Sequence, residues 1–160
     1  MTERTSADTP SRSPLPRGRR RGSLRRVVVA GTFDGLHEGH REYFRQAKRH
    51  GDVLIAIVAR DATVEKLKGH RPQLLEGARL QAVAAEPLVD EAVLGRAGGD
   101  RFAILKELRP DVVFLGYDQP ASEEELRARL REYGLEKTEV LRGSPFRPEI
   151  YKSSKMRDEG

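Results

Sequence analysis

Cysteine and tryptophan are absent from this chain, and its only aromatic residues are four tyrosines and five phenylalanines. Without cysteine there can be no disulfide bond, no thiolate metal site and no cysteine nucleophile. Long apolar runs are absent too: no stretch approaches the roughly 20 residues of a membrane-spanning helix, and none resembles the apolar core of a signal peptide. A length of 160 residues makes one domain the default expectation. These features favour a single-domain cytoplasmic protein with no membrane segment.

Acidic residues are scarce in the first 26 residues, which hold two acids against eight arginines. This segment has a formal charge of +6, so the rest of the chain carries −1 of the total of +5. Because residues 1–24 are also rich in Ser, Thr, Pro and Gly, they are predicted to be a disordered basic tail. A solvated tail and a nucleic-acid contact both fit such a segment. The domain expected over residues 25–160 is therefore close to neutral, which argues against a nucleic-acid-binding fold.

One stretch of the sequence, residues 27–40, is distinctive. An apolar run of valine and alanine leads directly into Gly-Thr-Phe-Asp at 31–34, and His37, Gly39 and His40 follow. After them, apolar and charged residues alternate with helical spacing. The pattern predicts a buried strand, a tight loop and a helix, with both histidines in the first helical turn.

The first turn of a helix is suited to phosphate, because its backbone N–H groups lack helical partners and the helix dipole favours an anion. His37 and His40 are three residues apart and therefore share one helix face. Gly39 leaves room for the sugar or base of a ligand to approach the backbone. Two imidazoles above such amides can hold a polyphosphate and stabilise the charge that builds when it is attacked.

The string Gly-Thr-Phe-Asp-x-x-His-x-Gly-His resembles the signature of the HxGH nucleotidyltransferases, the cytidylyltransferase-like family. A lone His-x-x-His on a helix is typical of an ordinary surface pair, whereas the whole string between a buried strand and an amphipathic helix is specific. The resemblance implies nucleotidyl transfer, with His37 and His40 as catalytic residues and Asp34 as an acceptor-binding carboxylate. The residues that it places at the nucleotide here are Thr32, Phe33, His37, Glu38, Gly39 and His40.

Along the rest of the chain, apolar runs alternate with helical patterns, which predicts an α/β fold with a parallel sheet covered on both faces. The resemblance implies a Rossmann-like, doubly wound sheet of five strands in the order 3-2-1-4-5, with ligands at the reversal between strands one and four. The expected strands are about 25–31, 53–59, 89–95, 111–116 and 137–142, and the expected helices are about 38–49, 62–67, 73–86, 100–110 and 122–133. The expected buried positions of helix 73–86 are Leu74, Leu75, Ala78, Val83 and Ala84, and Asp100 is the expected N-cap of helix 100–110.

Three further segments carry candidate site residues. Asp118 follows the fourth strand, where a carboxylate can accept hydrogen bonds from a ribose or base, although an aspartate before a proline is equally typical of a turn. Lys66 and Lys68 follow the second strand and can act as point charges for phosphate, although a solvated surface explains them as well. The resemblance assigns catalysis to Lys66 and Lys68, nucleotide binding to Asp118 and acceptor binding to Arg79.

A second motif lies near the C-terminus. Tyr151-Lys152-Ser153-Ser154 resembles the Arg-Thr-Ser-x-x-Ile motif of the family. There, Ser153 or Ser154 would cap a short helix that faces the nucleotide phosphates, Lys152 would add charge, and Tyr151 would pack on the base. Lysine in place of arginine removes a bidentate fork. A polar C-terminal tail is the alternative interpretation.

Within the family, the sequence is most similar to archaeal-type FAD synthases, through Lys66-x-Lys68-Gly69, Gly116-Tyr117-Asp118-Gln119 and the C-terminal motif. The implied reaction is FMN adenylyl transfer, in which FMN and ATP give FAD and pyrophosphate by in-line attack on the α-phosphorus. Mg²⁺ or another divalent cation would bind mainly through the substrate phosphates.

A glycerol-3-phosphate cytidylyltransferase that uses CTP is the alternative, although such enzymes usually have tryptophan where this chain has Gln119. A non-catalytic nucleotide- or nucleic-acid-binding module is the alternative of another class. Family members are often dimers, so a homodimer is an expectation.

Overall fold

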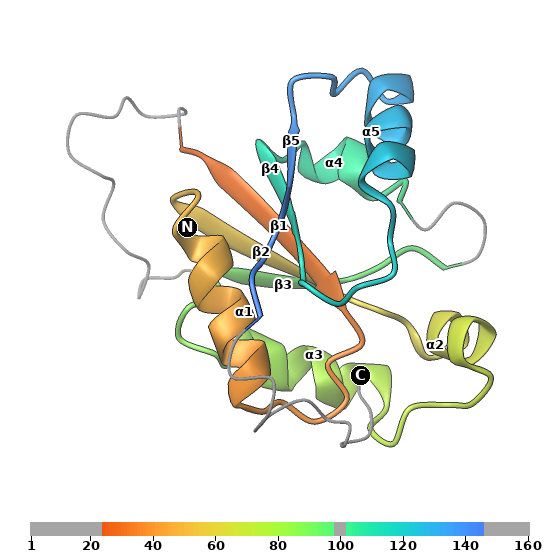
Figure 1. Ribbon diagram of the computed structural model, residues 1–160. Coiled ribbons are helices and arrows are strands. Elements are labelled where there is room, and N and C mark those ends of the chain that lie inside the picture. Colours follow the sequence, from red (N-terminus) through yellow and green to blue (C-terminus); the bar gives the residue numbers. More distant parts are fainter. Residues whose placement is uncertain (1–23, 98–101, 146–160) are drawn as a thin grey trace.

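The structure, a computed structural model, describes residues 24–97 and 102–145. Strands and helices alternate in these ranges, as the sequence pattern predicts, except that two helices, α2 and α3, lie between the second and third strands (Figure 1). The strands are β1 (Arg26–Gly31), β2 (Val53–Val58), β3 (Glu91–Leu94), β4 (Val112–Leu115) and β5 (Glu139–Arg142). The helices are α1 (Glu38–Lys48), α2 (Asp61–Lys68), α3 (Glu76–Ala84), α4 (Leu105–Leu108) and α5 (Glu123–Glu132).

The five strands form one parallel sheet in the order β3-β2-β1-β4-β5, which confirms the predicted Rossmann-like topology. Strand β1 pairs with β2 along its whole length, from Arg26 opposite Val53 to Gly31 opposite Val58. With β4, by contrast, β1 pairs only at its start, where Val27 and Val28 lie opposite residues 112 and 113. The two strands therefore separate towards their carboxyl ends, at the reversal of strand order where open α/β sheets bind ligands.

Alternating side chains of the buried strands supply two apolar layers, one on each face of the sheet. Val27 and Val29 pack with Phe44 of α1 and Val83 of α3. Val28, between them, packs on the other face with α4 and α5. Figure 1 shows this arrangement, with α1 and α3 on one side of the sheet and α4 and α5 on the other. The result is a sheet covered on both faces, whose carboxyl edge carries the candidate site.

The helix predicted over 73–86 starts later, at Glu76, and two of its expected core residues are exposed. Leu74 is 41% exposed and Leu75 is 62% exposed, because the chain bends at residues 73 and 74 and Leu75 is the extended N-cap residue. Ala78 and Ala84 are exposed as well. Val83 is buried as predicted, but the other fully buried side chain of this helix is Arg79.

The helix predicted over 100–110 is shorter than expected. Residues 102–104 form turns, and the amides of residues 105–107 bond to carbonyl groups only three residues back, a spacing of the tighter 3₁₀ type. Regular helix is confined to α4, which ends where Arg109 adopts a left-handed conformation. The predicted N-cap Asp100 lies outside the described residues, as do nearly all of the basic tail and the whole second motif.

Among residues 24–97 and 102–145, no helix has both the length and the apolar character needed to cross a membrane.

Candidate active site

The two histidines cap the first turn of α1 reciprocally. His37 is the N-cap residue, and its Nδ1 accepts a hydrogen bond from the backbone N–H of Gly39 at 3.0 Å. His40 returns the bond: its Nδ1 accepts the backbone N–H of His37 at 3.2 Å. The ring centroids are 4.0 Å apart. Because each Nδ1 accepts a hydrogen bond, each neutral ring carries its own hydrogen on Nε2. Two backbone N–H groups at the start of the helix thus bond to the imidazoles, and the Nε2–H groups remain to donate hydrogen bonds to a ligand.

Both imidazoles are held in the neutral form. Burial, with smaller contributions from His37, Arg41 and Lys68, lowers the pKa of His40 to about 3. Burial and the charge of Arg41 also lower the pKa of His37. Near neutral pH the pair therefore offers two uncharged hydrogen-bond donors rather than cations. Such fixed donors can stabilise charge that develops on a phosphate without first losing a proton.

Phe33 supports His40 through a contact between their rings. Its side chain is 2% exposed, and its ring meets the imidazole of His40 edge-on at a centroid distance of 5.4 Å. The backbone of Phe33 has a φ of 55°, a left-handed conformation that is costly for a bulky residue. Gly31 makes the arrangement feasible, because a Cβ there would lie only 3.0 Å from the Phe33 ring. The signature loop is thus a strained turn whose buried ring supports the second histidine.

Gly39 has a local reason to be glycine. A Cβ at this position would lie 2.9 Å from Cε1 and 3.1 Å from Nδ1 of His37. The space beside Gly39, which the sequence analysis assigns to a ligand, is therefore occupied by the His37 ring where a Cβ would point. A methyl group here would push the His37 ring away from the helix start.

Side chains fill the separation between β1 and β4. The Nε2 of Gln119 donates to the carbonyl oxygen of Ala30 at 3.0 Å, and its Oε1 accepts the Gly116 N–H at 2.6 Å. The Tyr43 hydroxyl, from α1, donates to the Phe114 carbonyl at 2.9 Å and lies 3.1 Å from the same Oε1. Burial raises the pKa of Tyr43, so its hydroxyl stays protonated. These side-chain hydrogen bonds replace the backbone pairing that β1 and β4 lack at their carboxyl ends, and they join the two strand ends.

Arg142, at the end of β5, anchors the turn that carries Asp118. Its guanidinium forms a two-pronged ion pair with Glu123, at 2.8 and 3.0 Å, which lowers the pKa of that carboxyl to about 2. Its remaining donors bond to three backbone carbonyls of the turn, those of residues 116, 119 and 121, at 2.7 to 2.9 Å. All five guanidinium N–H groups are used in this way. Asp118 itself is exposed at the tip of the anchored turn.

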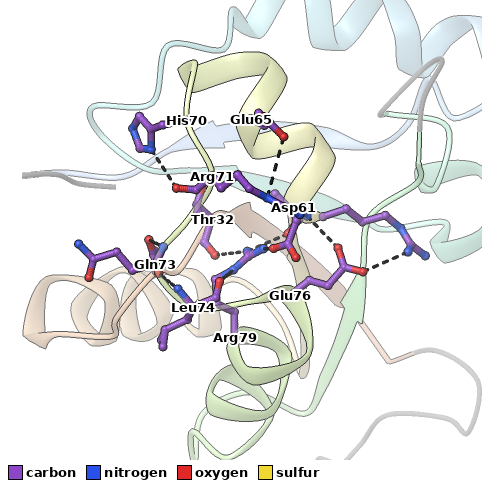
Figure 2. Close-up of polar contacts among 12 residues, drawn as sticks. Thr32, Asp61, Glu65, His70, Arg71, Gln73, Leu74, Glu76 and Arg79 are labelled. Atoms are coloured by element: carbon purple, nitrogen blue, oxygen red, sulfur yellow. Dashed lines mark hydrogen bonds and ion pairs between the residues drawn. The ribbon is translucent and has the colours of Figure 1, made fainter.

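Arg79 is the corresponding anchor on the other side of the site, shown in Figure 2. The guanidinium has no exposed surface and donates to the carbonyl oxygens of Thr32, Ala59 and Leu74, each at 2.8 Å. It also pairs with Asp61 at 2.7 Å. A cation enclosed in this way holds the signature loop, the end of β2 and the segment before α3 together. We therefore assign Arg79 to the scaffold of the site rather than to direct contact with the acceptor.

Asp34 and Lys68 lie on the same side of the site as Arg79. The carboxylate of Asp34 accepts the backbone N–H groups of Gln73 and Leu74, at 2.7 and 2.9 Å. Lys68 is close enough to Asp34 and to His40 to influence charge there, and burial lowers its own pKa. Lys66 and Lys68 are both exposed on α2, but because they are two residues apart they do not share one helix face. The structure thus brings Lys68, of the two predicted lysines, towards the histidines.

The other predicted residues divide into described and undescribed positions. Glu38, in the first turn of α1, has its carboxylate 2.9 Å from Arg45, which holds its pKa below the ordinary value. Tyr151, Lys152, Ser153 and Ser154 lie outside the described residues. The structural roles of Gln119, Tyr43 and Arg142 were not predicted. A glutamine directly after the candidate aspartate was the one available signal.

Comparison with known proteins identifies the family of this chain. The sequence model described as cytidylyltransferase-like matches residues 28–159, which include every predicted site residue. The chain belongs to the cytidylyltransferase-like family. It is 38% identical to the FAD synthase of Methanohalophilus mahii over 83% of this chain and 92% of that protein. It is 44% identical to the FAD synthase of Methanoculleus marisnigri over 82% and 85% of the two chains.

A solved structure gives the same result for the fold. The Thermoplasma volcanium protein described as a lipopolysaccharide core biosynthesis protein superposes with a TM-score of 0.73 and 36% identity, over 78% of this chain and 99% of that one. As a cytidylyltransferase-like protein, this chain is a nucleotidyltransferase, and the sheet reversal beside His37 and His40 is where the family signature lies.

Proposed function

We propose that this cytidylyltransferase-like protein is an FMN adenylyltransferase, which forms FAD and pyrophosphate from FMN and ATP. The FAD synthases of several archaea, matched over about four fifths of the chain, support this acceptor and this nucleotide. One structural observation supports the chemistry: Nδ1 of both His37 and His40 accepts a backbone N–H at the start of α1, so the hydrogen of each neutral ring is on Nε2 and can be donated to a phosphate.

The reaction requires no covalent enzyme intermediate. A phosphate oxygen of FMN attacks the α-phosphorus of ATP in line, and the bond from that phosphorus to the β-phosphate oxygen breaks to release pyrophosphate. Because the attacking oxygen is already an anion, no general base is needed. The protein has to align the two phosphates and stabilise the developing charge. The neutral imidazoles of His37 and His40 serve the second task as hydrogen-bond donors.

The remaining predicted residues take supporting roles. Lys68 offers a positive charge beside His40, and Lys66 is a second cation of α2 for the substrate phosphates. Asp118, on its anchored turn, accepts hydrogen bonds from the adenosine. Asp34 and Arg79 hold the acceptor side of the site in shape through the stretch before α3. The residues that complete the nucleotide site in this proposal are Thr32, Phe33, Glu38, Gly39, Tyr151, Lys152, Ser153 and Ser154.

A divalent cation, Mg²⁺ or a similar ion, enters with the triphosphate. The described residues contain no group of three His, Asp or Glu side chains that could enclose a metal, and both Asp34 oxygens already accept backbone N–H groups. This donor set fits an ion coordinated chiefly by substrate oxygens, as is common for Mg²⁺. The ion would neutralise charge on the leaving pyrophosphate.

A glycerol-3-phosphate cytidylyltransferase is not favoured, since Gln119 stands where those enzymes usually have tryptophan and the curated relatives are FAD synthases. Two predictions from the sequence accompany the proposal: a cytoplasmic location and a homodimer.

A substrate matrix tests the proposal. The purified full chain is incubated with Mg²⁺ and with ATP or CTP, each combined with FMN or glycerol 3-phosphate, and pyrophosphate and FAD are measured. We expect turnover with ATP and FMN to exceed that of every other pair. Turnover only with CTP and glycerol 3-phosphate would overturn the acceptor assignment. No turnover with any pair, together with salt-sensitive nucleic-acid binding that is lost on deletion of residues 1–24, would favour a binding module instead.

A further inference from the structure

Exposed apolar side chains are concentrated in one short segment. Among the described residues, the large hydrophobic side chains that are exposed are Leu67, Leu74 and Leu75, at 59%, 41% and 62%. All three lie between the last turn of α2 and the start of α3. A single exposed leucine is ordinary, but three within nine residues of sequence, beside a candidate site, call for an explanation. We call Leu67, Leu74 and Leu75 the leucine platform.

The leucine platform borders the acceptor side of the site. Leu67 and Lys68 follow the buried Val64 by three and four residues, so all three share one face of α2. Lys68 on that face is close enough to Asp34 and His40 for charges to interact. Asp34 in turn accepts the backbone N–H of Leu74 at 2.9 Å. In Figure 1, α2 lies beyond the ends of β1 and β2, apart from the helices that cover the sheet.

The segment that carries the platform is fixed in place. Arg79 bonds to the carbonyl oxygen of Leu74, and Glu76 accepts the backbone N–H of Asp61 at 2.8 Å (Figure 2). Together with the two Asp34 bonds, these contacts hold the chain before α3 against the start of α2. Leu74 and Leu75 are therefore exposed on a supported backbone, and a ligand would not have to order their segment on binding.

A second copy of the chain is a poor match for this surface. Stable interfaces bury about 800 Å² on each partner, far more than three partly exposed leucines present. The acceptor of the proposed reaction is a better match, because FMN joins a phosphate to a large, flat, largely apolar ring system. Its phosphate has to reach the histidines and Lys68, and the platform begins at the residue next to Lys68.

We propose that the leucine platform is the subsite for the isoalloxazine ring of FMN. This inference rests on the proposed function and assigns the ring to a part of the site that the phosphate chemistry does not use. The platform supplies apolar contact for one end of the acceptor, while the histidines and Lys68 receive its phosphate. It thereby selects a flavin phosphate over an alcohol phosphate that lacks a ring.

A pair of double variants tests the assignment. Leu67→Asn/Leu74→Asn removes two of the three leucines of the platform, whereas Leu67→Met/Leu74→Met keeps the apolar contact and serves as the matched control. Because Leu67 and Leu74 are exposed, the melting temperatures of both variants should stay close to that of the wild type. We expect the asparagine variant to raise the KM for FMN by about tenfold or more, with the KM for ATP little changed. The methionine variant should behave like the wild type.

A ringless acceptor sharpens the result. Ribitol 5-phosphate keeps the sugar-alcohol phosphate and lacks the ring, so its turnover should be equally poor in the wild type and both variants. An unchanged KM for FMN in the asparagine variant would overturn the subsite. So would a loss of dimer in sedimentation with FMN kinetics intact, because it would assign the leucines to a second copy. Absence of FAD formation by the wild type is a different failure and would remove the proposed function together with the subsite.

Discussion

A Cβ placed on Gly39 would lie 2.9 Å from Cε1 of His37, closer than real Cβ contacts come. The substitution Gly39→Ala should therefore displace the His37 ring and lower the rate of nucleotidyl transfer, even though alanine favours helix more than glycine does. Gly77 is a matched control, because it is also the second residue of a helix and a Cβ there would meet nothing within 4 Å.

We expect Gly77→Ala to keep activity and to raise stability by about 0.5–1 kcal/mol. Steady-state kinetics and thermal unfolding of both variants check this. Wild-type turnover by Gly39→Ala would show that the contact between residue 39 and the His37 ring has no consequence for catalysis.

Arg142 should act on nucleotide binding without touching the nucleotide, because it anchors the turn that carries Asp118. Arg142→Lys cannot bond to Glu123 and to three carbonyls at once, so we expect the KM for ATP to rise more than the KM for FMN. Arg127→Lys, on the neighbouring α5, is the control and should leave both constants unchanged. Equal effects on both substrates would assign Arg142 to general stability alone.

Arg79 separates a scaffold role from a substrate-binding role. With no exposed surface and four internal hydrogen bonds, its replacement in Arg79→Met should cost about 3–5 kcal/mol of folding free energy. Arg71→Met is the control, because this arginine is 64% exposed and its contact to Glu65 is long, at 4.0 Å. The control should change stability by less than about 0.5 kcal/mol. Chemical denaturation measures both, and a stable Arg79→Met variant with only a raised KM would restore the role in acceptor binding.

The neutral histidine pair predicts how stability depends on pH. The pKa of His40 falls from 6.5 to about 3 on folding, so between these values the unfolded chain binds more protons than the folded one. Stability should consequently fall as the pH drops through this window, by up to about 2 kcal/mol between pH 7 and pH 5 from His40 alone. His37 contributes in the same direction, because its pKa is lowered too.

Denaturation of the wild type and of His40→Gln at pH 7 and pH 5 checks this dependence. The variant should lose less stability over this interval than the wild type does. The ion pair of Glu123 and Arg142 does not interfere, since the pKa of Glu123 falls to about 2, so its contribution is lost only at lower pH. Identical losses in the two proteins would contradict the lowered pKa of His40.

The position of the histidines was predictable because its signals are local, whereas the sheet order followed from the family resemblance. An apolar run before Gly31, and two histidines at the start of a helical pattern, define the strand, loop and helix without reference to distant residues. The roles of Arg79 and Arg142 were not predictable in this way. Arg79 bonds to Thr32, which lies 47 positions away, and Arg142 bonds to a turn about 20 positions earlier. The sequence around an arginine does not indicate partners at such distances along the chain.

The same limit explains the errors in the helices. Leu74 and Leu75 fit a helical apolar face by spacing, yet the carbonyl of Leu74 accepts a hydrogen bond from Arg79 and the chain bends there before the helix starts. Spacing identifies residues that could be buried, whereas the contacts that decide burial come from the rest of the fold.

The most direct test of the account is the rate of FAD and pyrophosphate formation by His37→Asn, measured with FMN, ATP and Mg²⁺. Asparagine is a good N-cap residue, so the variant keeps the cap of α1 and should unfold at the wild-type temperature, but it lacks the Nε2–H donor. The account predicts a loss of about 10²–10³ in turnover with the fold intact. Turnover close to that of the wild type would contradict the claim that the capping imidazoles act on the phosphate chain.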